Sequence, residues 1–324
     1  MSAFNGLTSA YLLDGTGGGR ELQWDEVLRW QPAEGLLWIH WDYAHEATRA
    51  WLIDESQMDP VIITALLAEE TRPRSQVHHD GLLVVLRGVN LNPGAEPDDM
   101  VAIRLWAEPQ RIISTQRRKL NSVDDLCASI DNGDGPRSTG EFLNMLSELI
   151  IDRLAEVLEN NEEVVDALED AVLENAALNV RRPLADARRQ LIGIRRYLSP
   201  QRDALVRLSN EKSNLFTNEH RLHARELGER MTRLLEDLDA ARDRATVTHE
   251  ELMSQVSYRM GQKMYFLSAV MVIFLPLTFV TGLLGTNVLG IPFAQHPWGF
   301  WIVCGFLGML GLTSFLVLKR KKWL

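Results

Sequence analysis

The chain has 324 residues, and its 44 Asp and Glu outnumber its 34 Lys and Arg, which gives a formal net charge of −10 at pH 7. This acidic balance argues against nucleic acid as a partner, because such binding relies on clustered Lys and Arg. The two cysteines, Cys127 and Cys304, lie far apart, which argues against a disulfide framework and against a cysteine-based zinc site.

Residues 1–137 are predicted to form an α/β domain. Asp59 followed by Pro60 predicts a helix over residues 61–69, with Asp59 as its N-cap. The glycines of residues 15–19 lack the Lys and Ser/Thr of a phosphate-binding loop and predict a hairpin turn. Short apolar runs bounded by turn residues predict strands at 9–13, 36–40, 82–86, 101–106 and 112–115.

Two adjacent histidines, His78 and His79, follow in an apparent strand of this domain. Successive side chains of a strand point to opposite faces. We therefore expect no metal ion to be shared between these two rings.

Residues 138–264 are predicted to be a helical region that ends in a stalk. Apolar residues recur at steps of three, four or seven, which predicts three coiled-coil-like helices. The first apolar stripe runs from Leu143 through Val157 and Val164. The second stripe begins at Leu184 and the third at Met231.

The third stripe continues without a proline into a long apolar segment, which predicts one helix from Asn218 to Leu284 on the order of 100 Å long. A helix of this length can bury its stripe only against the two preceding helices or against copies of itself, so we expect a homo-oligomer. His220 and His223 lie three residues apart at its start, a spacing that can share a metal ion. Two ordinary solvated histidines are the alternative.

Residues 265–324 are predicted to be a transmembrane hairpin with a basic C-terminal tail, because residues 265–318 contain no Asp, Glu, Lys or Arg. A spanning helix needs about 20 apolar residues, which fits spans at 265–284 and 297–318. Basic residues precede the first span and follow the second. The positive-inside rule therefore predicts that both termini are cytoplasmic.

The N-terminal residues have neither the basic region nor the apolar region of a signal peptide. We therefore expect residues 1–264 to stay in the cytosol. All Asp and Glu and all but four Lys and Arg lie in this part, which gives it a charge of about −14. Such a surface can attract cations, although acidic solvated surfaces are common among soluble domains.

The turn between the spans contains Gly285, Thr286 and Asn287. The Asn287 carbonyl oxygen can accept a hydrogen bond from a metal-bound water without removing the hydration shell, and glycine lets the backbone bend. Gly and Asn also form ordinary exposed turns. The tripeptide by itself is therefore compatible with both interpretations.

The whole chain resembles the CorA superfamily of divalent-cation transporters, which combine an acidic α/β domain, a long stalk helix, a Gly-x-Asn turn, a second span and a short basic tail. The segments most similar to its ZntB branch of zinc transporters are 70–74, 195–203, 274–285, 290–292 and 322–324.

Two departures bear on the transported ion. The superfamily's common Gly-Met-Asn is here Gly285-Thr286-Asn287, and residues 293–296 lack the glutamate that magnesium-type members tend to have in this loop. The resemblance implies a transporter of divalent cations with zinc favoured over magnesium, and a homopentamer in a bacterial inner membrane. It implies no cofactor other than the transported Zn²⁺, and the sequence carries no hydrolase or kinase signature, so we expect no enzyme.

The resemblance also implies that the first span lines a pore below Asn287. The positions facing the axis would recur at steps of three and four: Gly282, Thr278, Leu275, Met271, Leu267 or Ser268, Met264 and Gly261. Thr278 could hydrogen-bond to the water around an ion, and the apolar members would form constrictions that gate by dewetting. Without the resemblance, the same residues would be interpreted as lipid or helix contacts.

His296 is predicted to lie at the outer mouth, where a protonated imidazole would repel cations. A loop histidine without a role is the alternative. A membrane-anchored scaffold or sensor is the rival class of function, but it would not need a polar Thr278 on the inferred pore face with Asn287 at its mouth. No carboxylate lies within the spans to relay protons, so the direction of transport and its coupling to protons are not predicted.

Overall fold

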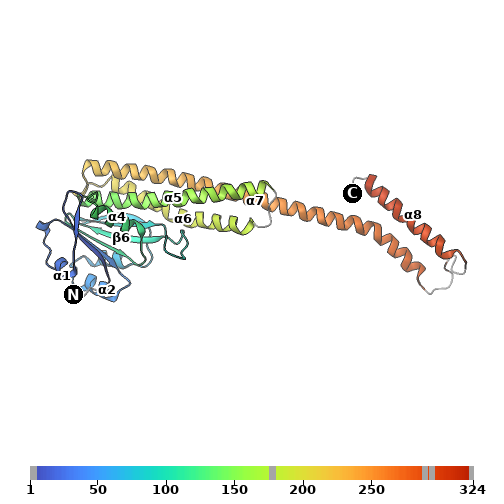
Figure 1. Cartoon of the computed structure of the whole chain (residues 1–324), viewed down its shortest axis with the longest axis horizontal. Coiled ribbons are helices and arrows are strands. Elements are labelled where there is room, and N and C mark those ends of the chain that lie inside the picture. Colours follow the sequence, from blue (N-terminus) through green and yellow to red (C-terminus); the bar gives the residue numbers. More distant parts are fainter. Residues whose placement is uncertain (1–5, 175–179, 287–290, 292–295, 321–324) are drawn as a thin grey trace. The chain divides into compact units, whose positions relative to one another are not determined.

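The computed structural model describes residues 6–174, 180–286, 291 and 296–320 (Figure 1). Contacts within the chain define two compact units, Met1–His249 and Glu250–Leu324. Helix α7 begins in the first unit and ends in the second, and its observed bounds, Asn218–Leu284, confirm the predicted stalk helix. The predicted domain boundaries after residues 137 and 264 stay predictions.

The first unit is built on a seven-stranded sheet. Its strands are β1 (Leu7–Leu13), β2 (Gly19–Glu21), β3 (Leu36–Asp42), β4 (Arg74–His78), β5 (Gly81–Gly88), β6 (Val101–Ala107) and β7 (Arg111–Gln116). Their order is β2-β1-β3-β7-β6-β5-β4, with β3 and β7 parallel and the other neighbours antiparallel. The five predicted strands are confirmed. Strand β2 was not predicted, because it is a short polar edge strand without a clear apolar alternation. Strand β4 is the apparent strand in which the sequence placed His78 and His79, and it ends at His78.

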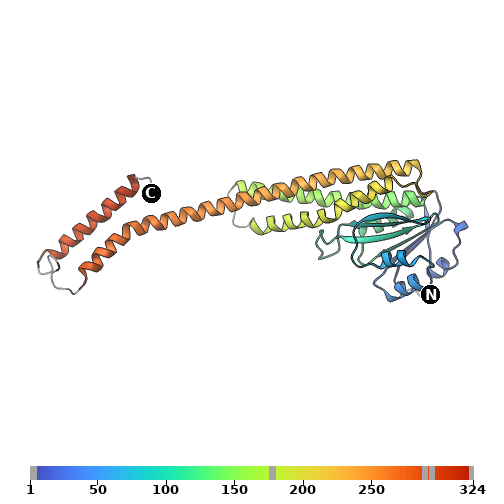
Figure 2. The same cartoon turned by 180° about the vertical axis from the view of Figure 1, so that it is seen from behind.

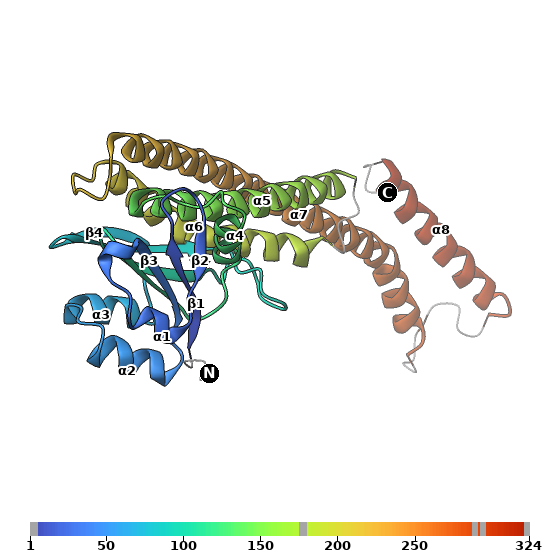
Figure 3. The same ribbon diagram turned by 60° about the vertical axis from the view of Figure 1, so that its left-hand side comes forward.

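Helices cover both faces of this sheet (Figure 3), as expected for an α/β domain. One face carries a short 3₁₀ helix and the helices α1 (Trp24–Val27), α2 (Glu46–Asp54) and α3 (Pro60–Leu67), and the other carries α4 (Asn121–Asp131), α5 (Thr139–Leu173) and α6 (Arg181–Ser209). Asp59 caps α3 as predicted, since its side chain accepts a hydrogen bond from the backbone N–H of Val61. The core between the sheet and α1 to α3 includes Trp41, Leu52 and Leu66.

The predicted stripe of α6 is buried from Leu184 to Leu208. The stripe of α5 is correct at first but wrong beyond Val157, because Val164 is 48% exposed and its neighbour Val165 is buried. Ile150, earlier in the same stripe, lies against β5 beside Gly88. Further along α5, Val157 and Val164 line a cavity instead of packing on the sheet. The covered side of α5 therefore changes along the helix.

The second unit contains the end of α7 and helix α8 (Gly299–Arg320), which runs back alongside it in the opposite direction (Figures 1 and 2). The most apolar segments of the two helices have mean hydropathies of 2.3 and 2.1, and only 6% of each segment is buried. Both helices are long and apolar enough to cross a membrane. The two predicted spans thus correspond to two candidate membrane helices.

Candidate functional site

One face of α7 in the second unit is turned toward α8. Its residues recur at steps of three and four and are buried or half-buried: Ala269, Ile273, Leu277, Val280 and Leu284. A methyl group on Gly311 of α8 would lie 3.7 Å from Leu277 Cδ1. Small residues allow this close approach of two membrane helices.

The predicted pore row lies on the opposite face of α7. At 100° per residue, five of its members are within about 40° of the direction opposite Ile273: Met264, Met271, Leu275, Thr278 and Gly282. These residues are exposed, with Met264 at 63%, Met271 at 54% and Leu275 at 70%. The row is therefore not used for packing against α8.

The alternative pore positions can be compared in the same way. Ser268 lies nearer to the centre of the row than Leu267, at about 40° rather than 60°, and both are exposed. Gly261 also lies about 60° from the centre and is exposed. Of the two alternatives, Ser268 is therefore better placed to belong to the row.

The end of α7 is closed by local hydrogen bonds. The Gly285 N–H donates to the carbonyl of Thr281 at 2.9 Å, and the Thr286 hydroxyl donates to the carbonyl of Leu283 at 2.8 Å. The Thr286 hydroxyl thus fastens the turn to the helix and keeps its lone pairs as acceptors. Asn287 lies outside the described residues, and its role as the selectivity element stays a prediction.

His296 lies just before α8. Its Nδ1 accepts a hydrogen bond from the backbone N–H of Trp298 at 3.2 Å, and its carbonyl accepts one from Gly299 at 2.8 Å. The imidazole therefore helps to satisfy the free N–H groups at the start of the helix. The predicted repulsion of cations by a protonated His296 stays a prediction.

His220 and His223 have separate sets of partners in the first unit. His220 Nδ1 accepts a hydrogen bond from the Thr217 N–H at 3.3 Å, and its Nε2 lies 3.4 Å from the Ser138 hydroxyl. His223 Nε2 lies 3.4 Å from a carboxylate oxygen of Glu148 on α5. Within the described chain, these contacts join α7 to α5. A metal ion shared by the two histidines stays a prediction.

His78 and His79 do not point to opposite faces, so that prediction is wrong. Strand β4 ends at His78, and His79 opens the two-residue turn to β5 with a φ of +49°. The ring centroids of His78 and His79 are therefore only 4.4 Å apart. The alternation of side chains holds only while the backbone stays extended. The following Asp80-Gly81 is a turn signal that could have placed His79 outside the strand.

Asp59 completes a group with these two histidines. Its Oδ2 lies 3.0 Å from His78 Nε2 and 3.9 Å from His79 Nε2. The hydrogen bond with His78, together with the one from the Val61 N–H, holds the pKa of Asp59 below its ordinary value. The potential ligand atoms of the three side chains all lie within 4.8 Å of one another.

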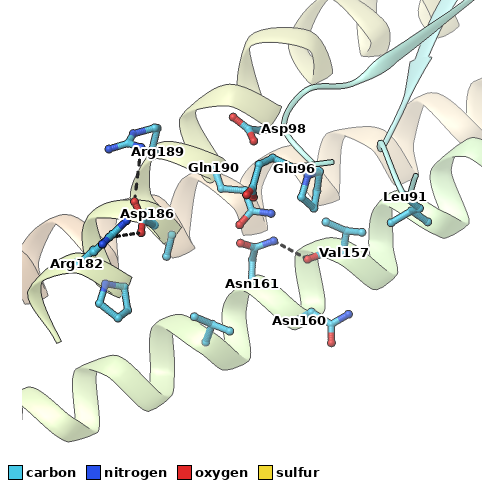
Figure 4. A pocket seen from close by; sticks show the side chains of 14 residues that line it. Leu91, Glu96, Asp98, Val157, Asn160, Asn161, Arg182, Asp186, Arg189 and Gln190 are labelled. Carbon is cyan, nitrogen blue, oxygen red and sulfur yellow. Dashed lines mark hydrogen bonds and ion pairs between the residues drawn. The ribbon is translucent and has the colours of Figure 1, made fainter. Parts of the chain in front are cut away.

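A cavity of about 830 Å³ lies between the loop after β5 and the helices α5 and α6 (Figure 4). The loop contributes Glu96 and Asp98. On α6, the carboxylate of Asp186 lies 3.9 Å from Arg182 and 3.5 Å from Arg189. These two arginines compete with a cation for the Asp186 carboxylate, so this residue does not favour a divalent cation.

The fold is that of a protein with two candidate membrane helices joined to an α/β unit. A family model described as "CorA-like Mg2+ transporter protein" matches residues 33–320. The chain is 39% identical over 323 residues to the divalent cation transporter CmaX of Pseudomonas aeruginosa, which covers 98% of this chain and 97% of that protein. It is 37% identical over 320 residues to the zinc transport protein ZntB of Pectobacterium atrosepticum, which covers 99% of this chain and 97% of that protein.

A solved structure of the full-length CmaX protein superimposes with a TM-score of 0.84 at 37% identity and covers 99% of both chains. The chain therefore belongs to the CorA-like family of transporters. The resemblance to the CorA superfamily and to ZntB is confirmed. The similarity to CmaX adds a relative that the sequence motifs did not single out.

Proposed function

We propose that this chain forms a homo-oligomeric, pentameric transporter that moves divalent cations, zinc foremost, through an axial pore in a bacterial inner membrane. The observation that carries this proposal is the exposed row of α7 on the face turned away from α8. Two spans cannot enclose a pore within one chain. Copies related by cyclic symmetry would bring this row together around one axis.

The residues of the row suit a hydrated ion that is guided rather than tightly bound. Thr278 would present a ring of hydroxyl groups to the water around the ion, while Leu275 and Met271 would form apolar constrictions. Asn287 would meet the hydrated ion at the mouth through its amide oxygen. In this arrangement the ion keeps its hydration water at every step. The cost of full dehydration is therefore avoided, which favours fast passage.

Two observations support zinc. The chain is 37% identical to a protein named for zinc transport, and its turn lacks the glutamate expected of magnesium-type members. Magnesium or another divalent cation is the second candidate, because the matching family model is named for Mg²⁺ and CmaX for divalent cations in general. Competition between Zn²⁺ and Mg²⁺ in one flux assay separates these candidates.

The test is zinc uptake into liposomes that contain the full-length protein. Asn287→Ala should abolish uptake while the protein keeps the oligomeric state of the wild type. Asn160→Ala is the matched control, because Asn160 is an exposed residue of α5 whose amide bonds to the carbonyl of Glu156.

Undiminished uptake by Asn287→Ala would reject the proposed role of this residue. A wild-type oligomer that transports neither Zn²⁺ nor Mg²⁺ would instead support a membrane-anchored scaffold or sensor. The same assay with and without a pH gradient measures the coupling to protons.

A further inference from the structure

We propose that Asp59, His78 and His79 form a binding site for a zinc-type transition-metal ion in the first unit. The site would supply two imidazole nitrogens and one carboxylate oxygen. This donor set suits Zn²⁺, with solvent as the fourth ligand, and does not suit Mg²⁺, which prefers oxygen ligands. The inference goes beyond the proposed pore, because the site lies in the first unit and needs no transport.

The distances fit a metal site that is close to its bound geometry. Zinc bonds of 2.0–2.2 Å in a tetrahedron place neighbouring ligand atoms about 3.3 Å apart. The distances from Asp59 Oδ2 to the two Nε2 atoms, 3.0 and 3.9 Å, lie on either side of this value. Shifts below about 1 Å, within reach of side-chain rotation, would bring all three atoms to one ion.

The carboxylate is held in place by the fold. Asp59 Oδ1 accepts a hydrogen bond from the Val61 N–H at 2.8 Å as the N-cap of α3, which leaves Oδ2 to face the histidines. His78 is held in β4 by its pairing with Gly81. The ligands therefore come from two elements that the sheet and its covering helix already position.

The backbone of His79 provides a second observation. A positive φ at the first residue of a two-residue hairpin turn favours glycine, since a side chain is strained there. His79 has a φ of +49° at this position. Strained backbone positions are often found where a side chain has a function. Here the turn is what places the second imidazole beside Asp59.

Exposure and charge favour reversible binding. The side chain of His78 is 25% exposed, that of Asp59 35% and that of His79 79%, so solvent can reach the ion. His79 also lines a cavity of about 520 Å³, which has room for a water ligand. The Asp59 carboxylate would supply the negative charge of the site. We expect an exchangeable ion rather than one required for folding.

The test is the number of Zn²⁺ ions that full-length protein in detergent micelles retains in equilibrium dialysis. His79→Gly should bind one Zn²⁺ per protomer fewer than the wild type. Its melting temperature should be unchanged or higher, because glycine removes the strain of the turn. His45→Gln is the matched control, since His45 is also an exposed histidine beside a carboxylate, at 3.9 Å from Asp42.

Asp59→Asn provides an independent variant. Asparagine is as good an N-cap as aspartate, so α3 should persist while the site loses its only charged ligand. We expect its Zn²⁺ affinity to fall at least tenfold. Co²⁺ bound to the wild type should show the intense visible absorption of a four-coordinate site, and both variants should lose it.

Equal Zn²⁺ content in the wild type and His79→Gly would overturn the proposal. So would an equal loss in His45→Gln, which would indicate adventitious surface binding, or displacement of Zn²⁺ by an equal concentration of Mg²⁺. The same dialysis on Asn287→Ala protein separates the two proposals. If Asn287→Ala abolishes transport, this variant should still retain the Zn²⁺ ion at Asp59.

Discussion

The two units differ in the exposure of their apolar side chains. In the first unit, Trp38, Trp41 and Leu66 have no exposed surface. In the second unit, Leu275 and Phe300 are each 70% exposed. The first unit is therefore stabilised by a core of its own, whereas the second needs other molecules to cover it. Lipid would cover its outer face, and copies of the chain would surround the axis on which the row that we assign to the pore lies.

Helix α7 passes from one environment to the other without a break. Ala245 is 0% exposed in the first unit, and Leu267 is 48% exposed in the second. An α-helix satisfies its backbone hydrogen bonds internally, so the same backbone is stable in a protein core and in lipid. Only the side chains need to change. A continuous helix is thus the simplest element that can cross the boundary.

The largest expected effect is on stability. Leu66→Ala should cost the first unit about 2–5 kcal/mol of unfolding free energy, because it leaves a cavity in a closed core. Leu275→Ala should change stability by less than about 0.5 kcal/mol, because Leu275 packs on little within its own chain. Hydrogen exchange in micelles measures both, at the β6 and β7 amides for Leu66→Ala and at the amides near the end of α7 for Leu275→Ala. Equal losses would break the comparison between the units.

A buried histidine should make the first unit sensitive to acid. Burial lowers the pKa of His40 from 6.5 to about 4. Because the folded state binds the proton less well than the unfolded state, stability is complete above pH 6.5 and falls as the pH approaches 4, by up to about 3 kcal/mol. Denaturant unfolding at pH 7.5 and 4.5 measures this loss. His40→Asn should show a smaller loss than the wild type, and equal losses would contradict the assignment.

A polar substitution in the exposed row should change transport rather than stability. Leu275→Ser should wet the proposed constriction and raise cation flux about fivefold, equivalent to about 1 kcal/mol in the barrier. Leu312→Ser on α8 is the control, because Leu312 is 59% exposed but lies outside the row. Liposome flux compares the two variants. Equal effects would show that the two exposed faces are not different in function.

The smallest effect is expected at the outer mouth. Acid on the outer face should slow inward flux about twofold, because a ring of protonated imidazoles would oppose an approaching cation. His296→Gln should flatten this response. Proton-coupled import would act in the opposite direction and accelerate uptake. Identical pH profiles for the wild type and the variant would contradict a role of His296 in this response.

The sequence by itself determined the elements whose signals are local. A helix from about Asn218 to Leu284 was predicted, because its apolar stripe continues without a break into the first span and a polar turn begins at Gly285. The cap at Asp59 and the five strands followed from residues within one turn or one strand. A fixed helical period also decides which residues of α7 share a face, but the lining of a pore by that face was implied by the resemblance and stays a prediction.

Only the tertiary structure decided what depends on neighbours distant in the sequence. It buried Val165 rather than Val164, because which side of α5 is covered depends on elements distant in the sequence. It brought Asp59 to His78, 19 residues away in the sequence. The positive φ of His79 placed the second ring beside them. Periodicity describes a regular element, but the turn that ends the element and the surface that covers it are set by the packing of the whole unit.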